Sequence, residues 1–178
     1  MEQHHWVQQI QSGDPVAFRK FYEAYANGAI RTASAITRNR ELAKDAVQET
    51  FIRVFRQIGS YDPALPFDPW FYRILTNECL RLMDKETLLV KVEPANLEDN
   101  PTLAEESFDQ LSNLYDVIQS LDNHHRIPLI LKYVKGFSEK EIAGILNVNQ
   151  NTLKSRLFKA RKQLKLRLDL PGEEDVTR

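Results

Sequence analysis

The clearest chemistry in the sequence lies between residues 150 and 168, which carry seven lysines and arginines and no acidic residue. The apolar positions of this stretch, Leu153, Leu157 and Ala160, recur at helical spacing and predict a buried face. The remaining surface is basic, hydroxyl and aromatic: Lys154, Ser155, Phe158 and Lys159, flanked by Arg156 and Arg161. Such side chains reach phosphates and base edges in the major groove. We therefore expect a DNA-contacting helix, the alternative being a solvated basic surface helix.

The residues before this stretch predict the element that would position it. Ser138 and Glu141 have the spacing of a capping box, which marks the start of a helix. The apolar face of that short helix consists of Ile142, Ala143 and Leu146, and residues 147–149 follow as a tight turn. Two short helices joined by such a turn, the second one basic, are typical of a helix-turn-helix.

A second candidate site is the aromatic cluster that precedes Arg73, Asn77 and Arg81. Its members are Tyr61, Phe67, Trp70, Phe71 and Tyr72. Aromatic rings beside basic and amide side chains can stack on unpaired bases, although packing in a core is the simpler explanation. Phe71 is expected in the core. Because Trp70 and Tyr72 cannot both point inward alongside Phe71, we expect at least one of these two rings to be exposed.

Other kinds of chemistry have little support in the sequence. The four histidines form two adjacent pairs, and adjacent residues do not share a helix face, so no metal site is expected. Cys79 is the only cysteine, which excludes an internal disulfide and a cysteine-built zinc site. The sequence contains no glycine-rich phosphate loop, nucleophile elbow or HExxH motif. We therefore expect a protein that is not an enzyme and needs no cofactor.

The N-terminal half predicts a bundle of four helices, each with one apolar face. Asp14 and Pro15 mark the start of the first helix, whose apolar residues end at Tyr25. A short second helix would span residues 29–36, and a third would run from about Glu41 to Ile58. The loop at 59–69 ends in a second Asp-Pro pair, which opens the fourth helix. The expected inward residues include Phe18, Phe21, Tyr22, Val47, Phe51, Val54, Phe55, Leu75 and Leu82.

Helical periodicity fades near residue 87 and resumes at Phe108. We therefore predict an all-α chain with a bundle at 1–86, an acidic linker at 87–107, a helix-turn-helix domain at 108–170 and an acidic tail at 171–178. Within the third part, Gly136 is expected to close a helix. Pro128 would interrupt that helix if Asp122 capped it, so a later start, near His124, is favoured.

The net charge of −1 is a sum over strongly polarised segments. Residues 86–110 carry seven acidic groups and one basic group, whereas 150–168 are purely basic. Near-neutrality therefore does not exclude a nucleic-acid partner. No apolar stretch approaches the length of a membrane span, and no secretory signal is visible at the start. We expect a cytoplasmic protein without membrane insertion.

The order of these features resembles the extracytoplasmic-function (ECF) group of the bacterial sigma-70 family, and the resemblance covers nearly all of Ile10–Leu168. Ala43, Asp45 and Gln48–Phe51 are similar to the family's region 2.2 signature, and Phe67–Asn77 to the segment that melts and reads the −10 element. Residues 126–146 and 152–161 are similar to region 4.

The resemblance implies a role for each candidate residue. Asp45, Gln48 and Glu49 would dock on the β′ clamp helices of the RNA polymerase core. Asn77 would help to capture a flipped base of the −10 strand, with Trp70, Tyr72 and Arg73 nearby. The −35 element would be read by Lys154, Ser155, Phe158 and Lys159, with Arg156 and Arg161 toward the backbone. Further implied partners are the β flap, promoter DNA and an anti-sigma factor.

The sequence also departs from the family pattern. Lys44 stands where the family usually has an acidic residue, and the common Asp-x-x-Arg after the asparagine is reversed, as Arg81 and Asp84. The basic run that often follows is missing, which predicts weak non-specific affinity for the −10 strand. The rival hypothesis is a stand-alone helix-turn-helix regulator whose N-terminal bundle senses a ligand. It predicts a palindromic operator and no association with core polymerase.

Overall fold

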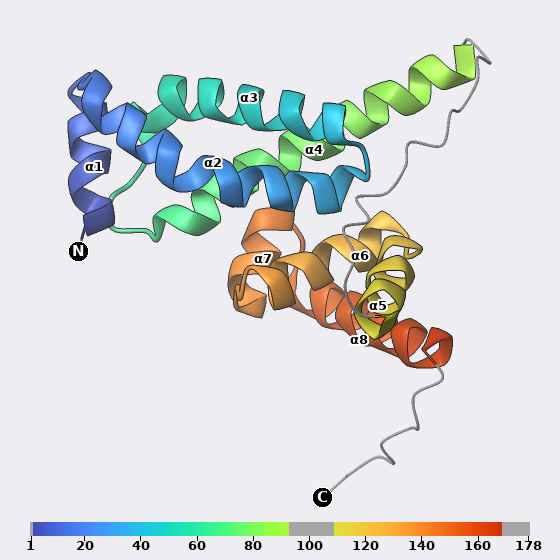
Figure 1. Ribbon diagram of the computed structural model, residues 1–178. Helices are drawn as coiled ribbons and strands as arrows, with labels where there is room; N and C mark the ends of the chain where they lie inside the picture. The colour runs from blue at the N-terminus through green and yellow to red at the C-terminus, as the bar shows by residue number, and fades with distance from the viewer. Residues whose placement is uncertain (1, 93–108, 169–178) are drawn as a thin grey trace, which may run out of the picture. The chain divides into compact units, whose positions relative to one another are not determined.

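The structure is a computed structural model that describes residues 2–92 and 109–168. Every regular element in these residues is helical, which confirms the all-α fold. The elements (Figure 1) are α1 (Glu2–Gln11), α2 (Pro15–Thr37), α3 (Arg40–Gln57), η1 (Ile58–Ser60), α4 (Phe67–Val92), α5 (Asp109–Gln119), α6 (Asn123–Leu129), η2 (Ile130–Val134), α7 (Glu139–Leu146) and α8 (Gln150–Arg167).

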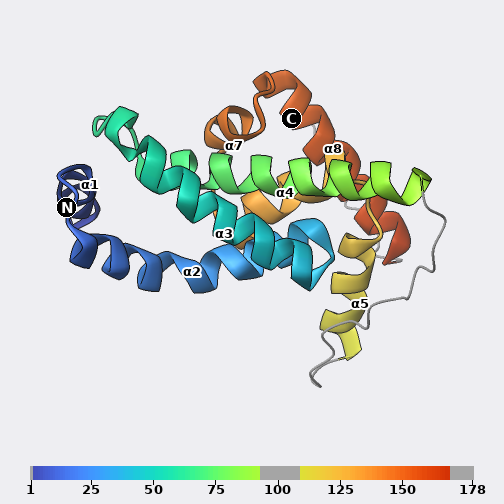
Figure 2. The same cartoon turned by 90° about the horizontal axis from the view of Figure 1, so that it is seen from above.

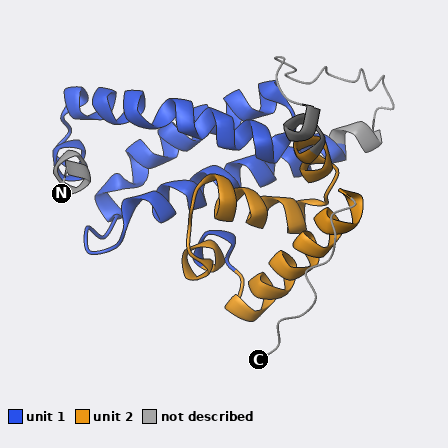
Figure 3. Cartoon of the chain, turned by 60° about the horizontal axis from the view of Figure 1, so that its bottom comes forward, with its two compact units in different colours: residues 1–98, 144–147 blue, residues 99–143, 148–178 orange. Residues whose placement is uncertain are grey.

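The chain divides into two compact units, residues 1–98 with 144–147 and residues 99–143 with 148–178 (Figure 3). The part of the predicted linker at 93–107 and the predicted tail at 171–178 lie outside the described residues. Residues 87–92, also predicted as linker, are the last residues of α4. The other domain boundaries stay predictions.

The first unit is built on α2, α3 and α4, each of which packs against the other two, while α1 lies across the start of α2 (Figures 1 and 2). Phe21 of α2 is fully buried at the centre. Its ring centroid lies 5.3 Å from that of Phe51 and 5.8 Å from that of Phe71. Edge-to-face contacts of this kind add to the apolar area that each ring buries. This aromatic core fixes α3 against α4.

The two helices expected between residues 15 and 36 are one helix, so that prediction was wrong. The Asp14 carboxylate caps α2 and accepts a hydrogen bond from the Val16 N–H at 2.8 Å, as predicted. The helix then continues through Gly28 to Thr37. A glycine costs about 1 kcal/mol relative to alanine in a helix interior. Phe21 and Ala29 are completely buried on either side of the break that was expected, and packing of this kind overrides local propensity.

In the second unit, Asp122 caps α6, so the predicted start near His124 was also wrong. Its carboxylate accepts a hydrogen bond from the His125 N–H at 3.1 Å. Pro128 consequently lies inside the helix, where it has no N–H to donate to the carbonyl four residues earlier. The chain widens directly afterwards into the π-helix η2, in which Lys135 donates to the Ile130 carbonyl at 3.2 Å. Gly136 ends the helix at φ 76°, as predicted.

The predicted helix-turn-helix is confirmed in detail. The Ser138 N–H donates to the Glu141 carboxylate at 2.8 Å, and the Glu141 N–H donates back to the Ser138 hydroxyl at 3.3 Å. Asn147 supplies the left-handed residue of the turn, with φ 52°. Asn149 then caps α8, its side-chain oxygen accepting from the Thr152 N–H at 2.7 Å. These bonds satisfy N–H groups that would otherwise lack partners at helix starts.

Candidate nucleic-acid interface

The outer surface of α8 presents the predicted DNA-contacting residues. Leu153, Leu157 and Ala160 are buried, which orients the helix. Of the six candidates, Lys154, Ser155, Phe158, Lys159 and Arg161 are exposed and Arg156 is partly buried. Helical spacing separates them into two adjacent stripes, one with Lys154, Phe158 and Arg161 and the other with Ser155, Arg156 and Lys159. Both stripes lie outside the buried face.

The stripe with Ser155, Arg156 and Lys159 borders a hollow of about 580 Å³ in the second unit. Asn151 and Thr152, from the start of α8, line the same hollow, as do Asp122, His124 and His125 from the start of α6. The lining combines cations, hydroxyls and an amide, which are the groups that hydrogen-bond to phosphates and sugars. His124 and Asn151 were not predicted as part of this surface, because the histidine pairs suggest only metal ligands and the contact between α6 and α8 joins residues far apart in sequence.

In the first unit, a smaller hollow brings together three of the four residues predicted to lie at the −10 strand. Trp70, Arg73 and Asn77 come from successive turns of α4, and together with Ile74 and Glu78 they line a volume of about 300 Å³. Arg53 and Gln57 of α3 complete the lining. The Trp70 ring packs against two other aromatic rings, since its centroid lies 5.0 Å from that of Tyr61 and 5.4 Å from that of Phe67. The hollow therefore combines an aromatic ring, two cations, two amides and a carboxylate.

Tyr72 does not share this surface, contrary to its predicted place beside the melted strand. Only 3% of its surface is exposed, and its ring lies 5.3 Å from that of Phe71. The helix α4 buries a wide face that includes Phe71, Tyr72 and Leu75, so two consecutive aromatic rings both point inward. The expectation that at least one of Trp70 and Tyr72 is exposed is met by Trp70, which is partly exposed. The expected burial of Phe71 is confirmed.

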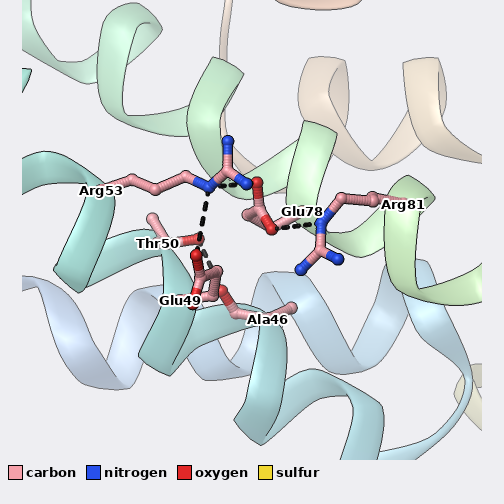
Figure 4. Close-up of polar contacts among 6 residues, drawn as sticks. All are labelled: Ala46, Glu49, Thr50, Arg53, Glu78 and Arg81. Atoms are coloured by element: carbon pink, nitrogen blue, oxygen red, sulfur yellow. Dashed lines mark hydrogen bonds and ion pairs between the residues drawn. The ribbon is translucent and has the colours of Figure 1, made fainter.

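Beside this hollow, a buried carboxylate joins α3 to α4 (Figure 4). The side chain of Glu78 is 3% exposed, and its two oxygens lie 2.7 Å from the Arg53 Nε and 2.8 Å from the Arg81 Nε. The Arg53 Nε also lies 3.4 Å from an oxygen of Glu49. Arg81, one of the three residues that depart from the family pattern, thus has its own partner within α4. A buried carboxylate needs such cations, since an uncompensated charge in the interior costs several kcal/mol.

A long apolar groove of about 1050 Å³ follows α2 and α3. Its apolar lining consists of Phe18, Tyr22, Ala26, Ile30, Val47, Phe51, Ile52 and Phe55. Tyr22 and Phe55 were predicted to point into the core, but 48% and 58% of their surfaces are exposed. Their sequence spacing is helical, yet they lie at the margin of the apolar face. At this margin they line the open groove and are not covered by another helix of the unit. Exposed apolar surface of this kind is typical of sites that bind another protein, a ligand or a membrane.

Of the three residues predicted to bind core polymerase, Gln48 lines the apolar groove. Asp45 is exposed and Glu49 is partly buried on the same helix, but neither lines it. Lys44 does line it, and its ammonium lies 2.7 Å from the Glu41 carboxylate. The hydrogen bond from Lys44 lowers the pKa of Glu41 below its usual value. The cation that departs from the family pattern is therefore paired locally and sits at the edge of the groove.

Neither a metal site nor a reactive thiol is found in the described part of the chain. Its histidine, cysteine, aspartate and glutamate side chains form no group of three that could hold a metal ion. Cys79 is buried, and burial raises the pKa of its thiol to about 12, so the nucleophilic thiolate is not available near neutral pH. None of the described helices combines the length and apolar character that crossing a membrane requires.

Comparison with known proteins agrees with this arrangement. Residues 21–88 match Sigma-70 region 2, and residues 111–164 match Sigma-70 region 4. The ECF RNA polymerase sigma factor SigE of Mycolicibacterium smegmatis is 31% identical over 164 residues, which cover 86% of this chain and 63% of SigE. The ECF RNA polymerase sigma factor SigM of Bacillus subtilis is 29% identical over 153 residues, which cover 82% of this chain and 91% of SigM.

Solved structures show the same fold. CnrH in complex with the cytosolic domain of CnrY has a TM-score of 0.69 and 21% identity, with 95% of this chain and 98% of that chain covered. The sigma factor RpoE of Bartonella quintana, in complex with the anti-sigma factor NepR, has a TM-score of 0.72 and 23% identity over 87% of this chain and 98% of that chain. The chain therefore belongs to the sigma-70 family of non-catalytic transcription initiation factors. Within that family it is an RNA polymerase sigma factor of the ECF group.

Proposed function

We propose that this sigma factor divides promoter recognition between its two units. The second unit reads the duplex −35 element through the exposed stripes of α8, and the first unit holds an unpaired base of the −10 strand in the hollow beside Trp70. The observation that carries this proposal is the position of Trp70, Arg73 and Asn77 around one hollow of about 300 Å³. That volume lies at the lower end of small-molecule sites, which suits one nucleotide rather than a duplex.

Each group at this hollow has a distinct task. The face of Trp70 offers a stacking surface, and stacking on an aromatic ring is worth about 1–3 kcal/mol per base. The side-chain amide of Asn77 has both donors and an acceptor, so it can pair with the edge of a base that has left the duplex. Arg73 supplies positive charge for the adjacent phosphate. An unpaired strand is thereby preferred over a duplex, because a stacked base cannot enter the hollow.

On α8, the two stripes suit the two kinds of contact that duplex recognition needs. Lys154, Ser155, Phe158 and Lys159 would reach base edges from the N-terminal part of the helix, with Arg156 and Arg161 toward the phosphates. The hollow beside Ser155 extends this surface to His124. Phosphate contacts set the register of the helix on the duplex, and base contacts supply the sequence preference.

The apolar groove along α2 and α3 would receive a helix of the polymerase core, namely the β′ clamp helices. Gln48 lies inside the groove, and Asp45 and Glu49 would hydrogen-bond or pair at its border. Exposed Tyr22 and Phe55 provide the apolar contact, as anchors do in helix-in-groove recognition. The β flap is a second expected contact, with the second unit.

An anti-sigma factor is a further expected partner. The two solved structures are complexes with CnrY and with the anti-sigma factor NepR, and a chain of the same fold can be controlled in the same way. A partner that covered the groove along α2 and α3 would exclude the polymerase core by competition. We propose that this control and transcription itself take place in the cytoplasm.

The test is in vitro transcription with holoenzyme reconstituted from the full chain and polymerase core, followed by mapping of start sites. The expected result is initiation at discrete promoters only when the chain is present, together with co-purification of chain and core. Transcription that does not depend on the chain would contradict the proposal. So would tight, specific protection of a palindromic site by the chain alone, which is what a stand-alone regulator predicts.

A further inference from the structure

Arg53 lines the hollow and forms an ion pair with Glu78. The family resemblance gives no role to this arginine. Both contacts of the Arg53 guanidinium with acids, at 2.7 Å to Glu78 and 3.4 Å to Glu49, are made through Nε. A guanidinium has five N–H donors in a rigid plane, four of them on the two Nη atoms. Among the residues that the structure describes, these Nη atoms have no hydrogen-bond partner. Four donors are therefore available on a group whose orientation is already fixed.

The surroundings of Arg53 indicate what those donors meet. Arg53 lines the hollow opposite the α4 residues, and its side chain is 39% exposed. The other walls of this solvent-accessible hollow include an indole ring, two amides, a second cation (Arg73) and the Glu78 carboxylate, whose charge is already paired with Arg53 and Arg81. Such a lining is suited to an anionic ligand that carries an aromatic group. Nucleotides have this composition, with the base for Trp70 and Asn77 and the phosphate for the cation.

Arg81 provides an internal comparison. It pairs with the other oxygen of Glu78 at 2.8 Å, also through Nε, and its side chain is 48% exposed. It does not line the hollow. The two arginines thus share the same carboxylate, the same type of contact and similar exposure, but only one of them faces the ligand. Any effect of the ion pair on folding should appear in both, whereas an effect on the ligand should appear in Arg53 alone.

We propose that Arg53 is a further contact to the unpaired −10 strand, donating from Nη to a phosphate next to the captured base, and that Glu78 is its positioning residue. This inference rests on the proposed capture of a base at the hollow. Glu78 lies 2.7 Å from the Nε and, together with the hydrogen bond from that Nε to Glu49, restrains the guanidinium, while neither carboxylate accepts a hydrogen bond from Nη. Phosphate is bound well by such a planar fork, because two parallel N–H groups reach two oxygens.

The experiment uses holoenzyme and a fork-junction DNA derived from a mapped promoter, with the −10 segment single-stranded. Its affinity is measured by fluorescence anisotropy at several salt concentrations for the wild type, Arg53→Gln and Arg81→Gln. The slope of log K against log salt is negative, and loss of one phosphate contact on a single strand reduces its magnitude by about 0.7. We expect this decrease, with about tenfold weaker binding, for Arg53→Gln only. Equal effects in the two variants, or an unchanged slope in Arg53→Gln, would overturn the proposal.

Glu78 is tested by Glu78→Gln and Glu78→Asp, with the thermal midpoint of each variant recorded. If Glu78 positions Arg53, Glu78→Gln reproduces the lower slope of Arg53→Gln, and Glu78→Asp retains most of the wild-type slope. Glu78→Gln with a wild-type slope would refute the positioning role. Arg53→Lys, which keeps the charge but not the fork, should retain the slope and lose affinity. If wild-type holoenzyme binds the fork no better than full duplex, base capture at the hollow is wrong. Failure of base capture is therefore distinguished from failure of the Arg53 contact, which would leave wild-type fork binding intact.

Discussion

The Glu78 carboxylate lies 2.7 Å from the Arg53 Nε, and this ion pair ties α4 to α3 directly beside the hollow that contains Trp70 and Asn77. Arg81 binds the other oxygen from one turn further along α4. Arg81, which departs from the family pattern, is therefore part of the ion-pair cluster beside the hollow. The same carboxylate holds the two helices whose side chains line that hollow.

Replacing Glu78 should cost stability as well as strand binding. Glu78→Gln keeps the shape but removes the charge that two arginines share, and we expect the free energy of unfolding to fall by about 1–2 kcal/mol. The estimate is reduced from that of a fully buried pair because both arginines reach solvent, which screens the loss. Urea denaturation of the full chain measures it. Arg81→Gln is the control and should cost less than about 1 kcal/mol; a larger loss from Arg81→Gln than from Glu78→Gln would contradict the assignment.

Substitutions of two phenylalanines of α3 can distinguish the role of the apolar groove from that of the core. Phe55→Ala removes an exposed ring, so stability should change by less than about 0.5 kcal/mol while affinity for polymerase core falls. Phe51→Ala removes a buried ring and should cost about 3–5 kcal/mol. Core binding by surface plasmon resonance and thermal unfolding give the two readouts. Unchanged core affinity in Phe55→Ala would show that the groove serves another partner.

The −35 assignment predicts a separation between DNA reading and core binding. Lys159→Ala should reduce transcription from promoters that need their −35 element, since one charge-assisted contact is worth about 1.5–3 kcal/mol. Affinity for core should not change. Lys140→Ala, an exposed lysine at the start of α7, is the matched charge control. In vitro transcription and co-purification measure both quantities; parallel loss of transcription and core binding would mean that Lys159 supports the fold instead.

The burial of Cys79 predicts how the stability of the chain depends on pH and how slowly its thiol is alkylated in the native state. Burial raises the pKa of its thiol from 9.0 to about 12, so the native thiol remains protonated at pH 9–10, where an unfolded thiol ionises. Stability should therefore be unaffected below pH 9 and decline as the pH rises from about 9 towards 12, because the unfolded state alone releases this proton. Alkylation by iodoacetamide should be slow in the native chain and fast in urea. Rapid native alkylation at pH 8 would contradict the burial.

The helix-turn-helix was predictable from sequence because its signals are local. A capping box, a turn and a basic amphipathic helix each involve residues within four positions of one another, and tertiary contacts did not alter them. The errors arose where tertiary packing decides. Gly28 is carried through α2 by the burial of its neighbours, and Pro128 is accommodated by a π-turn that no local pattern indicates.

The kinds of side chain at the candidate site could be predicted from the sequence, but which particular residues lie together there could not. Tyr72 was misplaced because α4 buries a wider face than one helical stripe, which depends on how many neighbours surround it. Arg53 was missed because its role depends on contact between α3 and α4, far apart in sequence. Phe55 and Tyr22 follow the apolar period, and only the packed structure shows that nothing in the first unit's core covers them.

The most direct test of the central claim is permanganate probing of unpaired thymines at a mapped promoter with wild-type and Asn77→Ala holoenzyme. The side chain of Asn77 is exposed and makes no hydrogen bond with the described residues, so its replacement should leave the fold intact. We predict that the variant binds core and protects the −35 element normally, but that the reactivity of thymines in the −10 region falls at least about tenfold, as expected when a captured base loses its hydrogen bonds. Wild-type reactivity in Asn77→Ala, with Trp70→Ala equally active, would contradict base capture at this hollow.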